Sequence, residues 1–460
     1  MRMTVTAAGT GARRAMTERV EVAPGGLSIP RVPALGSALI WTGPALVALL
    51  CCAAAVLGFT TYAPYGSEAA FGIAVGAAAV VAMAQALILA ARPRLLEPLF
   101  GGLDRMYRVH KWLGISALAL MILHSQIEPD FDRALRETDL GELASEVGEL
   151  AFNALLALIA VSWFRRLPFV GLEIPYHIWR FSHRFMGLLF AVIVFHQLFV
   201  DLPTGVDPSL SVMLNGFGLA GIAAWVQTEF LAPRLRRREF TVSAVTPQGD
   251  TTLVTLAPKG RPMRWRPGQF AFLRAPEAGL SEPHPFTIAS APRADASLSM
   301  SIRARGDWTR RLPGALRAGM AVQVEGPYGR FNFRKGGARQ VWLAGGVGIT
   351  PFLAWAESLT AADRRDIHLV YAVRTPEEAV GVDTLAAAAA RNPRFSYRVV
   401  ASARDGRLTA EGLMGSAPFP VGKADLWFCG PAGLKDGILA GLRAQGQSPR
   451  RVRFEHFEFA

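Results

Sequence analysis

The amino-terminal half of the chain consists of long apolar runs separated by short polar connections. Six of these runs are long enough to cross a bilayer as helices, since about 20 apolar residues span its hydrocarbon core. They cover residues 35–60, 68–91, 107–127, 147–165, 178–201 and 209–231. We therefore expect an all-α, six-helix transmembrane domain over residues 35–232, preceded by an amino-terminal arm, residues 1–34.

The carboxyl-terminal half has shorter apolar runs that are broken frequently by Gly and Pro. Four of them alternate apolar and polar residues as half-buried strands do: residues 239–247, 251–258, 269–276 and 297–305. They predict an antiparallel β-barrel domain over residues 233–337. From residue 338 to residue 460, strands alternate with glycine turns and helices, which predicts an α/β domain with a doubly wound parallel sheet. The predicted fold class is a multi-domain membrane protein.

Basic residues concentrate on one side of the predicted spans. They precede span one, separate spans two and three, and follow spans four and six, whereas the loop over residues 128–149 is acidic. By the positive-inside rule, both termini are cytoplasmic. The excess of Arg over Lys suggests a bacterial genome, and hence the bacterial cell membrane. Part of the net charge of +13 comes from these basic loops on the cytoplasmic side, so it requires no nucleic-acid partner. The three cysteines imply no disulfide framework.

Two pairs of histidines lie within the predicted spans: His110 and His124 in span three, His183 and His196 in span five. Ionisable residues inside a membrane are rare, and neutral imidazole is a good axial ligand for haem iron. The first spacing, fourteen residues, is roughly 21 Å along a helix, which fits two haems stacked across a core about 30 Å thick. The thirteen-residue spacing turns the second pair of rings apart, so tilt, a bulge or opposed rotamers must correct it. Buried histidines bonded to neighbouring hydroxyls are the alternative.

Four short motifs carry the candidate chemistry of the second half. The barrel contains HPFTIAS (residues 284–290) and SIRARGDWT (301–309), and the α/β domain contains AGGVGITPF (344–352) and FCGPAG (428–433). Glycines in a turn between strand and helix let a dinucleotide phosphate approach the backbone amides, but alone this signal is weak. In this order and spacing, the four motifs resemble the ferredoxin–NADP reductase superfamily of flavoproteins.

Together with the histidine pairs, the motifs resemble the family of NADPH oxidases and ferric reductases over residues 35–460. The resemblance implies a domain with two b-type haems, a domain that binds FAD, and a domain that binds NADPH or, as an alternative donor, NADH. HPFT and GDWT are closest to the NADPH oxidase branch. The sequence contains no recognisable calcium-binding or adaptor module, so no protein activator is expected.

The resemblance also assigns roles to individual residues. His110 and His183 would hold the inner haem, and His124 and His196 the outer one. FAD would contact His284, Pro285, Phe286, Thr287, Ser290, Arg303, Gly306, Trp308 and Thr309. NADPH would contact Gly345, Gly346, Gly348, Ile349, Thr350, Pro351, Arg374, Ser402, Arg404, Arg407, Cys429, Gly430 and Pro431, with the serine–arginine cluster on the 2′-phosphate. Phe457, with Phe459 as second choice, would cover the flavin where nicotinamide must later stack.

These assignments predict electron transfer from cytoplasmic NADPH to oxygen outside the membrane. A haem with two histidine ligands has no open iron position, which favours superoxide as product. A ferric-chelate reductase would use the same parts, and a nonenzymatic anchor or transporter would hold no haem. His177 is expected to be no ligand, and Phe190 either bridges the haems or packs helices. GPYGRF (residues 326–331) is expected to form a turn near the domain boundary, and the sequence leaves open whether that turn is functional.

Overall fold

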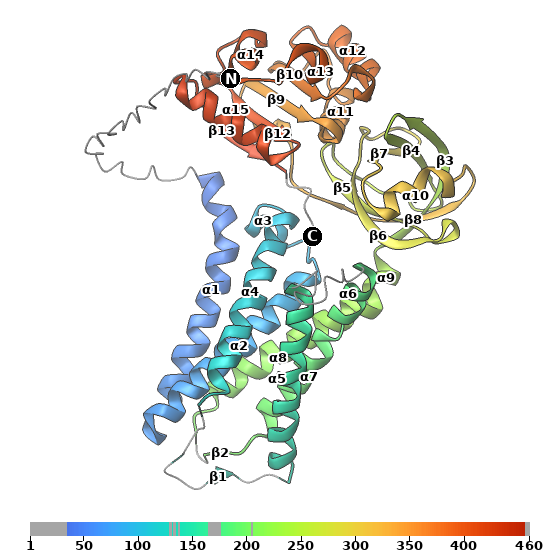
Figure 1. Cartoon of the computed structure of the whole chain (residues 1–460). Helices are drawn as coiled ribbons and strands as arrows, with labels where there is room; N and C mark the ends of the chain where they lie inside the picture. Colours follow the sequence, from blue (N-terminus) through green and yellow to red (C-terminus); the bar gives the residue numbers. More distant parts are fainter. Residues whose placement is uncertain are drawn as a thin grey trace, which may run out of the picture.

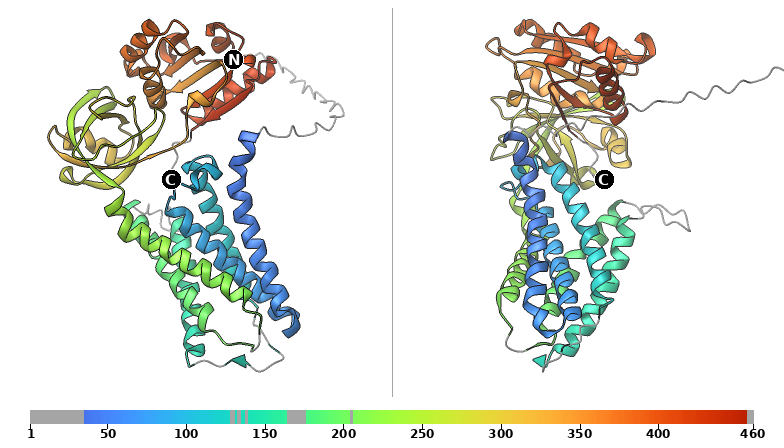
Figure 2. Two further views of the ribbon diagram at one scale, coloured as in Figure 1. Left: turned by 180° about the vertical axis from the view of Figure 1, so that it is seen from behind. Right: turned by 90° about the vertical axis from the view of Figure 1, so that its left-hand side faces the viewer.

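The computed structural model describes residues 35–127, 131, 135–136, 139–163, 176–203 and 206–455. It has three parts: a helical bundle up to residue 235, an antiparallel sheet domain from residue 237, and an α/β domain from residue 339 (Figure 1). Both sheet-containing parts lie at the same end of the bundle, and the two views in Figure 2 agree on this arrangement.

The bundle contains helices of the lengths expected from the sequence. They are α1 (Leu35–Tyr62), α2 (Ser67–Ala90), α3 (Glu97–Phe100), α4 (Leu103–His124), α5 (Gly141–Trp163), α6 (Tyr176–His183), α7 (Met186–Phe199), α8 (Ser209–Val226), a π-helical turn (Gln227–Leu231) and α9 (Ala232–Leu235). Within the described ranges, five segments are long and apolar enough to cross a membrane: Ile40–Tyr65, Ser67–Ala90, Gly141–Ser162, Ile178–Phe199 and Ser209–Leu231. These segments indicate a membrane protein, as the sequence predicts.

The third predicted span coincides with α4 but is less apolar than the other five. Its first turns contain four charged residues: Asp104, Arg105, Arg108 and Lys111. The rest of α4 packs against α2, with Leu113, Ala117 and Met121 buried. The sixth span therefore stays a prediction, carried by a helix with one charged end.

The fifth predicted span is not one helix, because α6 ends at His183 and α7 begins at Met186. At the break, the amide of Arg184 donates to Phe181 O at 3.3 Å and that of Phe185 to Ser182 O at 3.0 Å, a three-residue pattern that tightens the turn. The interruption lies between His183 and His196, whose thirteen-residue spacing would turn the two rings apart on a straight helix.

The antiparallel domain contains one six-stranded sheet, in the order β6-β5-β8-β3-β4-β7. Its strands are β3 (Arg237–Gln248), β4 (Thr251–Pro258), β5 (Phe270–Ala275), β6 (Leu280–Thr287), β7 (Leu298–Arg303) and β8 (Ala321–Tyr328). The edges beside β6 and β7 meet at a single bridge, Ile288 with Met300, so the sheet curls around an apolar core. Helix α10 (Asp307–Ala315) follows β7 directly.

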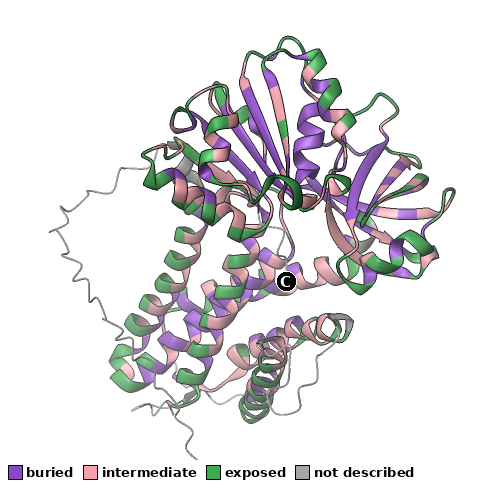
Figure 3. Cartoon of the chain, turned by 45° about the horizontal axis from the view of Figure 1, so that its top comes forward, coloured by how far each residue is buried: buried purple, intermediate pink, exposed green. Residues whose placement is uncertain are grey.

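The α/β domain contains five parallel strands in the order β11-β10-β9-β12-β13. They are β9 (Arg339–Gly345), β10 (Asp366–Val373), β11 (Phe395–Ala401), β12 (Asp425–Cys429) and β13 (Arg451–Phe454), and the helices are α11 (Thr350–Glu357), α12 (Val382–Arg391), α13 (Ser402–Asp405), α14 (Ala410–Ser416) and α15 (Ala432–Ala444). The central strands are buried on both faces (Figure 3). The strand order reverses between β9 and β12, which places a crevice at their carboxyl ends, where such sheets bind ligands.

The acidic connection after α4 meets the segment after α7 at the far end of the bundle. There β1 (Leu135–Arg136) pairs antiparallel with β2 (Leu202–Pro203). The two loops are thereby joined at the end opposite the sheet domains (Figure 1).

Candidate functional site

Both histidines of α4 are oriented by carbonyl groups of α2. Nδ1 of His110 lies 2.8 Å from Ala86 O, and Nδ1 of His124 lies 2.9 Å from Gly72 O. A carbonyl can only accept, so each Nδ1 carries the hydrogen, and the lone pair on Nε2 of the neutral ring stays free. A hydrogen-bonded Nδ1 of this kind is the usual support of a metal-ligating histidine.

The histidines of the broken span receive the same support from α5. Nδ1 of His196 lies 2.9 Å from Ala144 O, and Nδ1 of His183 lies 3.2 Å from Ser162 Oγ. The Ser162 hydroxyl donates its hydrogen to Leu158 O at 2.8 Å, so it accepts from His183. Among the described residues, all four rings therefore present a free Nε2. The alternative of histidines satisfied by hydroxyls accounts there for one Nδ1 and for no Nε2.

The inner pair, His110 and His183, has rings whose centres lie 6.2 Å apart at 69°. Two metal–nitrogen bonds of about 2.0 Å, together with roughly 1.1 Å from each nitrogen to its ring centre, require about 6 Å. The spacing thus suits one metal ion between the rings. Trp179 stacks on His183 at 5.2 Å, and Tyr107 meets His110 edge-on at 6.3 Å.

Glycines on α2 and α5 make room for the outer pair. A Cβ at Gly76 would lie 3.0 Å from Cε1 and Nδ1 of His124, and one at Gly148 would lie 2.5 Å from Nδ1 of His196. Any larger residue would displace the ring it faces. The positions of the His124 and His196 rings therefore depend on glycine at residue 76 of α2 and at residue 148 of α5.

The donor set distinguishes haem from a metal ion bound by protein alone. In the part of the chain that the structure describes, no group of three or more His, Cys, Asp or Glu residues could hold a metal. Two imidazoles are too few for a structural zinc site, but they are the axial set of a haem whose macrocycle supplies the other ligands. The donor chemistry of both pairs thus fits haem, and the ring spacing of the inner pair agrees with it.

Between the two pairs lies an apolar layer rather than a polar channel. Ala79, Met121 and Leu155, from α2, α4 and α5, form its buried centre. Phe190 belongs to a different cluster, where a Cβ at Gly221 of α8 would approach its ring to 2.6 Å. Of its two sequence interpretations, the structure therefore favours helix packing over a bridge between haems.

The predicted flavin residues meet where β6 approaches the start of α10. Strand β6 ends with His284, Pro285, Phe286 and Thr287, and the Trp308 ring lies 4.8 Å from His284 and 5.5 Å from Phe286. Thr287 Oγ1 and Trp308 Nε1 are buried without a hydrogen-bond partner among the described residues. Two orphaned polar atoms beside an aromatic surface fit a flavin ring. Burial lowers the pKa of His284, which favours its neutral form, although Glu282 opposes this shift.

Other residues of this set have local structural partners. Thr309 Oγ1 accepts from the amide of Gly306 at 2.9 Å, which caps α10. Ser290 is buried, and its hydroxyl accepts from the Ser299 amide at 3.0 Å, inside the antiparallel domain. The structure therefore gives Ser290 a packing role, and it leaves the amides at the start of α10 as the candidate phosphate contact.

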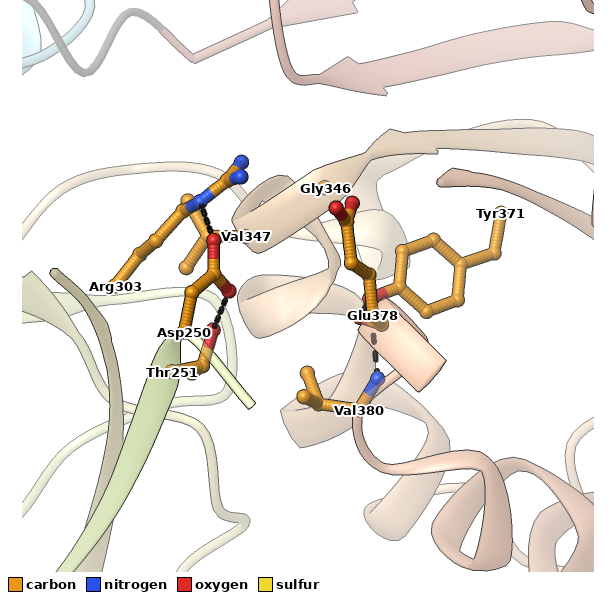
Figure 4. A pocket seen from close by; sticks show the side chains of 8 residues that line it. All are labelled: Asp250, Thr251, Arg303, Gly346, Val347, Tyr371, Glu378 and Val380. Atoms are coloured by element: carbon orange, nitrogen blue, oxygen red, sulfur yellow. Dashed lines mark hydrogen bonds and ion pairs between the residues drawn. The ribbon is translucent and has the colours of Figure 1, made fainter. Parts of the chain in front are cut away.

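Arg303, at the end of β7, lines a pocket between the two sheet domains. Its Nε is 2.6 Å from Asp250 Oδ2, and its Nη1 faces Gly346 of the nucleotide loop (Figure 4). Tyr371 and Glu378 line the same pocket from the α/β side. Burial raises the pKa of Tyr371 to about 12. Asp250 was not predicted from the sequence, because a lone acid in a hairpin turn usually is a solvated charge.

The two glycine loops of the crevice fit together only because their side chains are absent. A Cβ at Gly348 would lie 2.3 Å from Cys429 O, and one at Gly345 would lie 2.7 Å from Pro431 Cδ. Gly430 has φ +153°, which favours glycine. The other predicted contacts of these loops have buried side chains and can reach a nucleotide only through the backbone: Ile349, Thr350, Pro351 and Cys429.

The candidate 2′-phosphate cluster is assembled at the ends of β10 and β11. Arg374 O accepts from the Ala403 amide at 2.9 Å, which joins the two loops, and Arg407 is exposed nearby. Arg404 is paired with Asp405 through both Nε (2.8 Å) and Nη2 (2.9 Å). Its hydrogen bond lowers the pKa of Asp405 to about 2, so the acid stays charged and competes for the arginine. Asp405 was not predicted from the sequence, because its position next to Arg404 does not show that it would compete with the 2′-phosphate for the guanidinium group.

The predicted aromatic cover of the flavin, Phe457 or Phe459, lies outside the described residues, as does the side chain of His177. The last described residue, Glu455, has a buried Oε2 without a partner among those residues. Burial raises its pKa to about 8, with repulsion from Asp104 and Glu97 adding to the shift. Glu455 thus lies next to acidic groups of the bundle.

A pH dependence follows from this raised pKa. The stabilising contribution of protonated Glu455 is complete below its ordinary pKa near 4.5 and is lost as pH rises through about 8. We expect amide exchange in residues 451–455 to accelerate between pH 7 and 9 relative to the Glu455→Gln variant, measured by mass spectrometry. A constant ratio across this range would contradict the burial of a proton at Glu455.

Three families match consecutive parts of the chain. Residues 75–194 match the ferric reductase like transmembrane component, residues 235–332 an FAD-binding domain, and residues 342–438 an oxidoreductase NAD-binding domain. The chain thus contains, in this order, segments similar to a ferric-reductase-like membrane component, an FAD-binding domain and an oxidoreductase NAD-binding domain. The expected resemblance is thereby confirmed at the level of its three domains, as are its enzyme class and its membrane and flavoprotein character.

Curated relatives are similar to parts of this chain, each over part of its own length. The electron transfer component of toluate 1,2-dioxygenase from Pseudomonas putida is 30% identical over 42% of this chain and 58% of that protein. Ferric reduction oxidase 8 of Arabidopsis thaliana is 27% identical over 50% of this chain and 32% of that protein. Dual oxidase 2 of Sus scrofa is 25% identical over 56% of this chain and 18% of that protein. The chain thus spans at most 58% of these relatives.

Proposed function

We propose that this ferric-reductase-like oxidoreductase transfers electrons from NADPH, on the cytoplasmic side, across the membrane to oxygen, with superoxide as product. The observation that carries the proposal is the matched orientation of four imidazoles in two pairs, the inner rings 6.2 Å apart, in a chain with FAD- and NAD-binding domains. When bound, FAD accepts a hydride and releases electrons one at a time, and haem relays single electrons.

The histidines determine which acceptors can react. His110 and His183 would hold the inner haem and His124 and His196 the outer one, with carbonyls of α2 and α5 fixing three rings and Ser162 the fourth. With two imidazoles as its protein ligands, each haem would offer an acceptor no open iron position and would supply single electrons without binding it. One-electron, outer-sphere reduction of oxygen follows from that ligand set.

The sheet domains hold the donor and the flavin. Thr287 and Trp308 would supply polar contacts to the flavin, and the amides of Gly346 to Gly348 and of the start of α15 would contact nucleotide phosphates. Phe457 would exclude water from the flavin face until nicotinamide takes its place. These residues bind and orient, and they leave the redox chemistry to the cofactors.

The arrangement of the domains supports a cytoplasmic donor side. The basic loop after α2 contacts the antiparallel domain through Arg94, whose Nη2 lies 2.7 Å from Gly326 O. The sheet domains and the basic loop after α2 therefore lie at the same end of the bundle, which the positive-inside rule would place in the cytoplasm. Both termini would lie on that side of the bacterial cell membrane.

The decisive experiment uses the purified full-length protein with NADPH. We expect a reduced-minus-oxidised spectrum of two b-type haems per chain and superoxide formation that superoxide dismutase suppresses. A chain without haem would exclude the proposal. Haem reduction without superoxide, together with rapid anaerobic reduction of ferric citrate, would replace oxygen by a ferric chelate.

Ferric-chelate reduction is the second candidate, because the membrane component matches the ferric-reductase-like family and ferric reduction oxidase 8 is a relative. The electron path would be the same up to the outer histidine pair. Only the acceptor surface would differ. The ferric-citrate comparison distinguishes the two candidates.

Replacing Phe457 with serine should change the NADPH to NADH preference and the rate of hydride transfer without altering the haem spectra. An aromatic ring stacked on the flavin must move before nicotinamide can bind, and such stacking is worth ~1 kcal/mol. Pre-steady-state flavin reduction with each nucleotide measures the effect. Phe459→Ser is the control, and an effect confined to that control would transfer the role to Phe459.

A further inference from the structure

The segment between α2 and α4 runs along the end of β8, and three of its residues make polar contacts with residues 325–329 in the same order along both segments. Arg92 Nη1 lies 3.1 Å from Glu325 Oε1, Arg94 donates to Gly326 O, and the Gly329 amide donates to Glu97 Oε1 at 3.1 Å. The receiving segment contains the GPYG sequence (residues 326–329), for which a turn was predicted; residues 326–328 instead form the end of β8. This contact joins the bundle to the antiparallel domain.

The Arg92–Glu325 ion pair at the centre of this contact is nearly buried, with side-chain exposures of 16% and 10%. The Arg92 guanidinium stacks on Phe272 at 4.7 Å and on Tyr328 at 5.7 Å. Glu325 also accepts from the Tyr328 hydroxyl at 2.7 Å. A buried carboxylate held by two donors fixes geometry, and removal of one partner leaves an unbalanced charge.

Apolar packing continues from this ion pair to the inner histidine pair. One buried cluster includes Ala86, Leu89 and Phe100 of the bundle together with Phe270 and Tyr328 of the antiparallel domain. Ala86 is the residue whose carbonyl orients His110. Glu325 and the support of an inner imidazole therefore belong to a single packed unit.

Arg92 itself adopts φ +52°, in the left-handed region that residues other than glycine rarely occupy. The surrounding contacts hold it there, including Arg236 Nη1, which lies 2.7 Å from Ala91 O. Strained backbone of this kind persists where the neighbouring structure fixes it and is common at functional contacts.

We propose that Arg92 and Glu325 are positioning residues that fix the flavin-bearing domain against the inner histidine pair, and so set the rate at which electrons enter the membrane part. The proposal rests on the proposed function, because it presumes transfer between these two parts. Neither residue contacts the nucleotide loops or the imidazole rings in the described structure.

The test compares full-length protein, loaded with its cofactors, in three variants under anaerobiosis. Glu325→Gln keeps the shape of the side chain and removes its charge, whereas Arg92→Lys keeps the charge and removes the planar group that stacks on the aromatic rings. The matched control is Asp366→Asn, which removes the acidic partner of Arg394 from an exposed ion pair. NADPH-driven haem reduction reports entry into the membrane part, and NADPH-driven ferricyanide reduction reports the flavin alone. Amide exchange of residues 91–97 and 321–329, followed in protein without cofactors, reports the contact itself.

We expect Glu325→Gln to slow haem reduction about tenfold or more, since an ångström-scale displacement can cost up to about a hundredfold. In the same variant, ferricyanide reduction should stay within about twofold of the wild type, and amide exchange should rise in both segments. The rate of haem reduction in Arg92→Lys should lie between those of the wild type and Glu325→Gln, and Asp366→Asn should match the wild type. Should Glu325→Gln fail to accumulate, Arg92→Lys carries the same test. Equal haem reduction in wild type and variants, or an equal loss of ferricyanide reduction, would overturn the positioning role. Absence of NADPH-driven haem reduction in the wild type would instead overturn the proposed function.

Discussion

Replacing His124 with leucine should reduce the haem content from two per chain to one and abolish electron delivery to any external acceptor, while NADPH still reduces the flavin. Leucine fills the space of the ring but has no Nε2, so that His196 alone would remain to hold the outer haem. The haem to protein ratio and the amplitude of the b-type absorbance band measure the loss. His177→Leu is the matched control, because His177 is predicted to be no ligand. Full haem content in His124→Leu would remove His124 from the ligand set.

A glycine variant tests the same site without altering a ligand. Gly148→Ala places a methyl group where the structure leaves 2.5 Å to Nδ1 of His196, so the ring must move away from Ala144 O. We expect partial or complete loss of the outer haem. Gly114→Ala on α4 is the control, because a Cβ there meets no atom within 4 Å. Equal haem content in both variants would show that His196 does not occupy the described position when haem is bound.

The sequence predicted the histidine pairs because each signal was local. An ionisable residue in an apolar run is unusual whatever surrounds it, and fourteen residues along a helix convert directly into a distance. The helix breaks at Arg184–Phe185, where the sequence has neither Pro nor Gly. The one indication of an irregularity was the thirteen-residue spacing of His183 and His196, which would turn their rings apart on a straight helix. Its position could not be predicted, because tertiary packing determines where a helix yields.

The pattern of apolar and polar residues could not predict contacts between segments that are far apart in the sequence. Arg92 and Glu325 are 233 positions apart, and each alone is typical of a solvated charge. Arg303 was predicted as an FAD contact through its motif, but its ion pair with Asp250 depends on how two domains meet. Local motifs therefore indicated which residue types matter, and the assembled structure added their partners.

Replacing Arg404 with alanine should raise the Michaelis constant for NADPH roughly tenfold and leave that for NADH nearly unchanged, as expected for loss of one charged hydrogen bond to a 2′-phosphate. Asp405→Asn should act in the opposite direction. The substitution removes the negative charge that occupies Arg404 in the described structure, while the asparagine carbonyl can still accept from the Ala401 amide. Steady-state rates with both nucleotides, at saturating acceptor, measure the two constants.

The pair of variants separates three roles for this loop. An equal loss with both nucleotides in Arg404→Ala would show that the arginine supports the fold around α13. A lower constant for NADPH in Asp405→Asn would show that the acid, charged at every working pH because its pKa is about 2, restrains NADPH binding in the wild type. If instead Asp405→Asn weakened NADH binding, the carboxylate would be the acceptor for the ribose 2′-hydroxyl that is typical of NAD sites, and NADH would become the preferred donor.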